Sequence, residues 1–184
     1  MYAASGHELR KDWFGDAVSK GRHARLADTL RLADSDKGIL AGVSTTDFLQ
    51  AVSLFYTRDL RRVAENLGRQ GRELPAITGN RQALLELPLD PHKKYEMQVE
   101  DGFIRAAKFL HRLHIYRIFD LPYQSQIVPL AAILADIGKV EEHEAIRAKL
   151  VRWYWNGVFG ELYGSAVESR IARDRSPNLA QWGR

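Results

Sequence analysis

Arginine side chains are the residues of this sequence best suited to binding a ligand, because they gather in two groups. The first group extends from the C-terminal part of a predicted helix into the loop after it. The second group comes after an aromatic segment near the C-terminus. A guanidinium presents a planar fork of donors that fits a phosphate, so both groups are candidate phosphate contacts. They are Arg58, Arg61, Arg62, Arg69 and Arg72, and then Arg170, Arg173 and Arg175. Stabilisation of a helix C-terminus or a solvated helix face is the structural alternative.

The aromatic segment between residues 149 and 174 is the second place where side chains suited to binding come together. Its candidates for contacting a ligand or a partner are Arg152, Trp153, Trp155, Glu161, Tyr163, Glu168 and Arg170. Arg152 lies in a mostly apolar helix, and a buried guanidinium needs a carboxylate, which Glu161 or Glu168 can supply. A structural ion pair and a ligand contact both remain open for this arginine.

Catalytic and metal-binding patterns are weak by comparison. His111 and His114 are three residues apart on a predicted helix but have no carboxylate at matching spacing, so one buried and one exposed histidine is the simpler interpretation. Phosphate loops, dinucleotide fingerprints and Gly-x-Ser-x-Gly elbows are absent from the sequence. Gly164 and Ser165, with Glu168, fit a helix end followed by a capping box rather than a nucleophile. We therefore expect no catalytic residue, metal site or cofactor.

A family resemblance rests on the string Arg-Trp-Tyr-Trp…Glu-Leu-Tyr-Gly at residues 152–164. The segments Ser44–Leu54, Leu84–Asp90 and Leu121–Leu134 add to it. Together these segments resemble the helical region of GmrSD-type restriction endonucleases. In that family a ParB-like domain precedes the helical region and an HNH nuclease domain often follows it. The chain contains neither the Asp-Gly-Gln-Gln-Arg motif of the ParB-like domain nor an HNH pattern.

The resemblance implies a part of a larger anti-phage protein that cleaves modified DNA in a nucleotide-dependent manner. On this interpretation the chain is not itself an enzyme. It is a non-catalytic helical coupling domain whose partners are the ParB-like and HNH domains of the same polypeptide. The alternative is a helical module that binds nucleic acid through its arginine-rich faces. A continuous basic surface favours the module, whereas scattered charge with an exposed apolar patch favours the coupling domain.

Composition sets limits on the kind of protein. The 184 residues fit one domain, and we expect it to span residues 1–184 as part of a longer protein. The 27 Lys and Arg residues exceed the 23 Asp and Glu residues by four, which permits contact with nucleic acid without requiring it. No cysteine is present, and no apolar run reaches the roughly 18 residues that suggest a membrane span. We expect a cytoplasmic protein that does not enter a membrane.

Apolar residues recur at helical spacing almost throughout, so the predicted fold is all-α with about seven or eight helices and few or no strands. The predicted helices cover residues 16–34, 45–67, 80–87, 91–113, 126–137 and 142–163. In the second of these, one face carries Leu49, Val52, Tyr56, Leu60, Val63 and Leu67. The helix at 142–163 has two adjoining apolar stripes, one through Trp153 and one through Trp155. Such a helix is expected at the centre of the domain.

Overall fold

Helices account for every regular element in the part of the chain that the computed structural model describes, residues 8–30, 38–138 and 143–162. The α-helices are α1 (Leu9–Phe14), α2 (Arg22–Ala27), α3 (Thr45–Asn66), α4 (Arg81–Glu86), α5 (Leu89–Arg112), α6 (Ile127–Ile137) and α7 (Glu144–Phe159). The 3₁₀ turns are η2 (Ile39–Gly42), η3 (Gly71–Glu73), η4 (Ile118–Asp120) and η5 (Gln124–Gln126). Within these residues the only β-type pairing is an isolated bridge between Gly15 and Lys20. The all-α prediction is confirmed.

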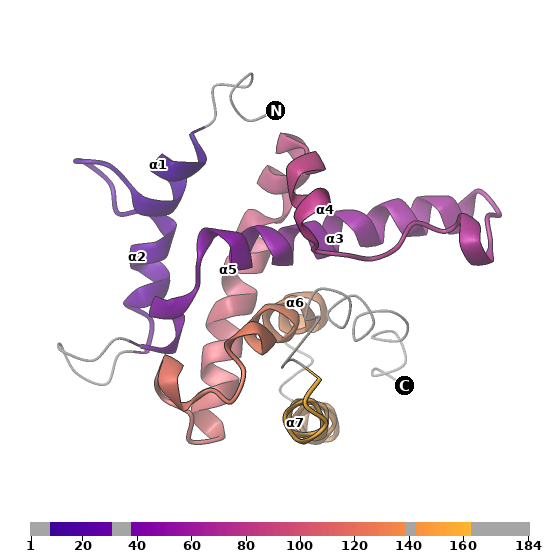
Figure 1. Cartoon of the computed structure of the whole chain (residues 1–184). Helices are drawn as coiled ribbons and strands as arrows, with labels where there is room; N and C mark the ends of the chain where they lie inside the picture. The colour runs from indigo at the N-terminus through magenta and orange to yellow at the C-terminus, as the bar shows by residue number, and fades with distance from the viewer. Residues whose placement is uncertain (1–7, 31–37, 139–142, 163–184) are drawn as a thin grey trace.

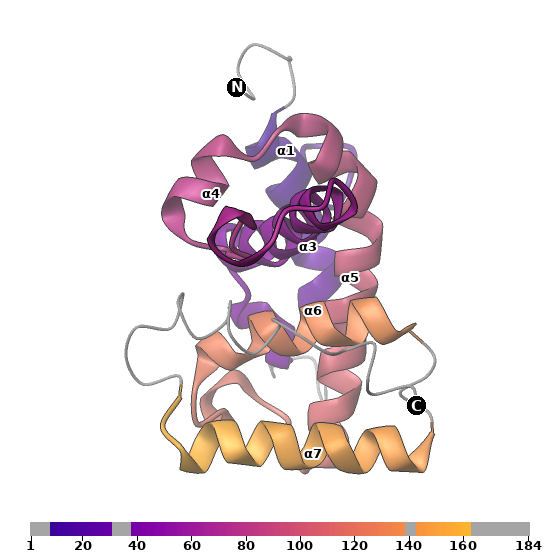
Figure 2. The same ribbon diagram turned by 90° about the vertical axis from the view of Figure 1, so that its right-hand side faces the viewer.

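Helix α5 is the long axis along which the other helices pack. Figure 2 shows it running vertically behind α3, α6 and α7, which cross it one above another. Its buried side chains include Tyr95, Val99, Phe103, Ala106 and Leu110, which recur at helical spacing within the helix predicted at 91–113. The 24-residue helix is therefore held by one apolar face that contacts several elements in turn.

The contact between α5 and α6 is the most extensive among the described helices, and Gly102 allows the two helices to approach closely. A Cβ atom at Gly102 would lie 2.4 Å from the carbonyl oxygen of Ala131 and 2.7 Å from the Cβ of Ala135. Only glycine lets the two backbones approach to this distance. Helix α6 is buried from Ile127 through Ala135, and it ends at Gly138, where φ is 56°.

Helix α3 is defined at both ends by its own sequence. The Ser44 hydroxyl accepts from the Asp47 backbone N–H at 3.1 Å, and the Asp47 carboxylate accepts from the Ser44 N–H at 2.8 Å, which forms a capping box. At the other end Gly68 has a φ of 80°. The N–H groups of Gly68 and Arg69 donate to the carbonyls of Glu65 and Ala64, as in a Schellman motif. The helix predicted at 45–67 is confirmed, and Gly68 ends it.

The shorter helices agree with the prediction in part. Asn80 caps α4 through a 2.9 Å hydrogen bond from the backbone N–H of Ala83, as its position before the helix indicates. The helix predicted at 16–34 is much shorter: α2 ends at Ala27, and residues 31–34 lie outside the described part of the chain. Helix α1 was not predicted, because its six residues are too few to show a clear period.

The aromatic helix is not at the centre of the fold, and this corrects the prediction for residues 142–163. Helix α7 forms an outer layer, on the far side of α6 from α3 (Figure 2). Its buried residues are Ile146, Leu150, Tyr154 and Gly157, which make a single narrow stripe. Both tryptophans are half-buried beside this stripe. The second apolar stripe, through Trp155, is thus only partly buried against the core, at the edge of the interface.

Candidate functional site

The arginines of α3 separate into structural and exposed members. Arg58 is 13% exposed and pairs with Asp136 of α6 and, at 3.3 Å, with Asp59. Its guanidinium also lies 4.7 Å from the centre of the Phe55 ring. This side chain packs α3 against α6, so its guanidinium is not free to contact a phosphate, as the sequence had suggested. Arg61 pairs with Glu65 at 2.9 Å along the same helix, which weakens its candidacy.

Three arginines of this group remain available. Arg62 is exposed near the end of α3, Arg69 follows the Schellman turn, and Arg72 lies in η3. Among the described residues, none of the three forms an ion pair with a carboxylate. They occupy the tip of α3, which extends well away from the rest of the molecule (Figure 1). Arg173 and Arg175 of the second group lie outside the described residues.

The apolar face of α3 passes from the core into solvent. Val52 is fully buried and Tyr56 half-buried, whereas Leu60, Val63 and Leu67 are 40%, 57% and 70% exposed. The face itself is continuous in sequence, but the rest of the described chain covers only its first half. We call Leu60, Val63 and Leu67 the exposed stripe.

A shallow groove lies beside the exposed stripe, between α3 and α4. It has a volume of about 270 Å³ and is lined by Tyr56, Thr57, Leu60, Thr78, Asn80, Gln82, Ala83 and Glu86. Its floor is rigid because the Thr57 hydroxyl accepts from the Thr78 N–H at 3.0 Å and donates to the Ser53 carbonyl at 2.8 Å. The groove is therefore a mostly polar surface beside the exposed stripe, with Leu60 common to both.

The predicted site on the aromatic helix is changed by the structure. Arg152 is exposed rather than buried, so the reason for expecting a buried partner no longer holds. Glu161 is also exposed and has a φ of 50°. Trp155 stacks on the exposed Phe159 with ring centres 5.7 Å apart. The remaining candidates, Tyr163, Glu168 and Arg170, and the turn at Gly164 and Ser165 lie outside the described residues.

Tyr154 is the aromatic anchor of α7, a role that the sequence does not reveal. Its ring meets Phe109 of α5 edge-on at 6.2 Å, and its carbonyl accepts from the Gln126 amide at 2.9 Å. Burial raises the pKa of the Tyr154 hydroxyl to about 12. Trp153 and Tyr154 follow Leu150 by three and four residues, so both positions are at helical spacing. Only the packing shows that Tyr154, rather than Trp153, continues the buried stripe.

The two histidines near the end of α5 differ in burial. His111 is half-buried, and burial lowers its pKa, whereas His114 is exposed with a φ of 62°. Both rings contact Tyr116 edge-on, at 5.1 and 6.2 Å. One partly buried and one exposed histidine is the arrangement that the sequence favours.

A buried ionic cluster between α1, α2 and α5 is the largest feature that was not expected from the sequence. Arg22 is 3% exposed, and its guanidinium pairs with Asp12 at 3.2 Å, with Glu96 at 3.1 Å and with Glu100. Arg25 donates to the same Glu100 carboxylate at 3.1 Å. The Phe48 ring lies 5.0 Å from the Arg22 guanidinium. This cluster fastens the two N-terminal helices to α5.

Three members of this region have the geometry of metal ligands. Asp12, His92 and Glu96 place one ligand atom each within 4.8 Å of one another. However, the Arg22 guanidinium already bridges Asp12 and Glu96, so the positive charge that a metal would bring is supplied by the protein. A cation would have to displace a buried arginine, which is costly. The arrangement is best explained as an internal salt-bridge network.

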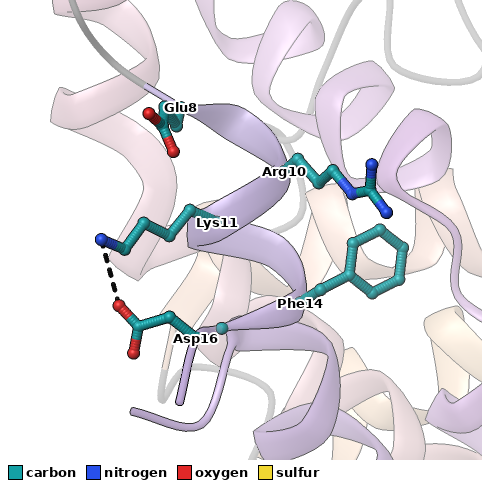
Figure 3. A pocket seen from close by; sticks show the side chains of 6 residues that line it. Glu8, Arg10, Lys11, Phe14 and Asp16 are labelled. Atoms are coloured by element: carbon teal, nitrogen blue, oxygen red, sulfur yellow. Dashed lines mark ion pairs between the residues drawn. The ribbon is translucent and has the colours of Figure 1, made fainter. Parts of the chain in front are cut away.

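A depression of about 560 Å³ beside α1 offers a further surface (Figure 3). Figure 3 shows Lys11 pointing toward Asp16, with a 3.1 Å ion pair between them, and Arg10 beside Phe14. Hydrogen bonds from the backbone N–H groups of Val18 and Ser19 lower the pKa of Asp16. Lys11 and Asp16 are thus paired with each other, and none of the residues that line the depression is buried.

Comparison with known proteins identifies no relative: no family model, curated protein or solved structure matches this chain. No helix within the described residues has the length and apolar character needed to cross a membrane.

Proposed function

We propose that this chain is a non-catalytic helical coupling domain that docks another protein domain on the exposed stripe of α3. The observation that carries the proposal is the rise in exposure from Val52 to Leu67 along one helix face. An apolar face that continues at helical spacing beyond its own core is typical of a surface covered by a partner. The groove beside Leu60 adds shape and hydrogen-bonding side chains to this surface.

The resemblance to the helical region of GmrSD-type endonucleases suggests what the partner is. In such proteins the neighbours are a ParB-like domain and an HNH nuclease domain, and the parent cleaves modified phage DNA. Coupling these two domains requires a rigid body between them. The interlocked α3, α5 and α6 supply the rigidity, through the core and through the Arg58 ion pairs.

The test uses the complete polypeptide that the gene encodes. Val63→Asn combined with Leu67→Asn, which adds no charge beside the arginines at the end of α3, should reduce nucleotide-dependent DNA cleavage by about tenfold or more, since burying each side chain contributes roughly 1.5–3 kcal/mol. Stability to urea should change little, because both side chains are exposed. The matched control is Met97→Asn with Phe119→Asn, whose side chains are 68% and 88% exposed on other elements.

Three results would contradict the proposal. The first is a gene that encodes no ParB-like or nuclease domain beside this chain, together with a purified chain that binds no protein containing such a domain. The second is a stripe variant that cleaves DNA as fast as the parent. The third is a control variant that loses as much activity as the stripe variant, which would show that replacing any exposed apolar side chain by a polar one is harmful.

A further inference from the structure

We infer that the tip of α3 is a nucleic-acid contact, in which Arg62, Arg69 and Arg72 bind backbone phosphates. This inference goes beyond the coupling role and rests on different residues. The exposed stripe and the tip arginines belong to the same projecting element but present different chemistry. Val63 follows Arg62 by one residue, which turns it about 100° around the helix.

The reach of the element is the first step of the argument. Helix α3 has 22 residues, so it is about 33 Å long at the usual rise per residue. Only its first part is surrounded by other helices, and the tip with η3 lies at the far end of the projection (Figure 1). A duplex can approach such a tip without meeting the body of the domain.

The charge of the tip is the second step. Residues 61–73 contain four arginines and two glutamates, a net charge of +2. Glu65 is paired with Arg61, which leaves Glu73 as the one acidic side chain beside the three exposed arginines. Arginine is well suited to phosphate because its planar guanidinium can donate two parallel hydrogen bonds to two phosphate oxygens.

The shape and composition of the tip distinguish nucleic acid from an acidic protein. Residues 68–73 have no apolar side chain, whereas protein interfaces are built around apolar or aromatic anchors. Gly68 and Gly71 have positive φ values, 80° and 59°, and nothing lies within 4 Å of a Cβ placed on either. The backbone between the arginines is thus open to close approach by a phosphate chain. Because the three proposed contacts are with phosphates, which carry no sequence information, we expect the contact to be independent of sequence.

The experiment measures binding of the full chain to a fluorescein-labelled DNA duplex of about 20 base pairs, by anisotropy, between about 50 and 200 mM salt. Three phosphate contacts correspond to a slope of about −2.7 in log K against log salt. Replacing all three tip arginines (Arg62→Gln, Arg69→Gln, Arg72→Gln) should reduce the size of this slope by about 2 to 3 and weaken binding at low salt at least tenfold. The single change Gln70→Glu should also weaken binding.

The matched control removes the same charge elsewhere, at the exposed Lys108, Arg112 and Lys149. This triple glutamine variant should keep the parent's slope to within about one. The inference is overturned if the parent does not bind the duplex at low salt, or if both triple variants lose affinity equally. It is also overturned if polyglutamate displaces the duplex at an equal concentration of negative charge, because the tip would then recognise acidic protein.

Discussion

Replacing Arg22 tests whether the buried ionic cluster fastens the N-terminal helices to α5. Removal of one member of a buried ion pair costs roughly 3–5 kcal/mol, because an uncompensated charge is left behind. In Arg22→Met, Glu100 keeps its contact with Arg25, and Asp12 and Glu96 are 25% and 24% exposed, so water partly compensates them. We therefore expect a loss near the lower limit, about 3 kcal/mol. In a domain of this size that corresponds to a fall in Tm of roughly 6–12 °C.

The assay is urea unfolding followed by circular dichroism, with thermal unfolding as a second measurement. Arg25→Met is the matched control, because Arg25 is 47% exposed and contacts the same carboxylate. Its loss should not exceed about 1 kcal/mol. Adding Glu96→Gln to Arg22→Met should recover part of the stability, since it removes one of the stranded charges.

Equal stability of the Arg22 and Arg25 variants would refute this reasoning. It would mean that burial of the guanidinium contributes nothing beyond a surface ion pair. The double variant Arg22→Met with Glu96→Gln would also contradict the reasoning if its loss of stability equalled the sum of the two single losses. Charge compensation between Arg22 and Glu96 would then be absent.

Two further predictions concern α6 and α7. Gly102→Ala should destabilise the chain by about 1–3 kcal/mol in urea unfolding, because the new methyl group meets the Ala131 carbonyl across the helix contact; unchanged stability would show that α5 and α6 can separate at no cost. For Tyr154, the raised pKa means that the unfolded chain loses its phenolic proton first as the pH rises. The free energy of unfolding should therefore fall between about pH 10 and pH 12. Tyr154→Phe should remove the part of this fall that is due to the Tyr154 hydroxyl, which is checked by urea unfolding of both proteins across that pH range.

Local signals in the sequence predict most of the helices correctly. Gly68 ends α3 because its positive φ completes the Schellman turn, and Asn80 begins α4 through its side-chain cap. The stripe through Tyr95, Val99 and Phe103 identifies the buried face of α5. Such features depend on neighbours within one or two turns, so they can be recognised without knowing the fold.

Features that depend on distant contacts were not predicted. Arg22 meets Glu96 and Glu100 across 74 and 78 residues of sequence. The available signal was the series His92, Glu96 and Glu100, spaced by four residues beside the apolar stripe of α5. Polar residues at this spacing suggest a buried network only once another element is known to cover them. The structural role of Arg58 was hidden for the same reason, because its partner Asp136 belongs to α6.

The exposed stripe shows why periodicity predicts a helix face but not its partner. Leu60, Val63 and Leu67 continue the face that includes Val52, and at the level of sequence nothing distinguishes the buried half from the exposed half. The difference arises because α5 and α6 cross only the first part of α3, while the capping box and the Schellman turn fix the helix at its full length. Helix length is thus encoded locally, whereas its coverage depends on the rest of the fold. A stripe that the described helices leave uncovered, ending in a turn with three exposed arginines, is therefore the region where the function of this chain is best sought.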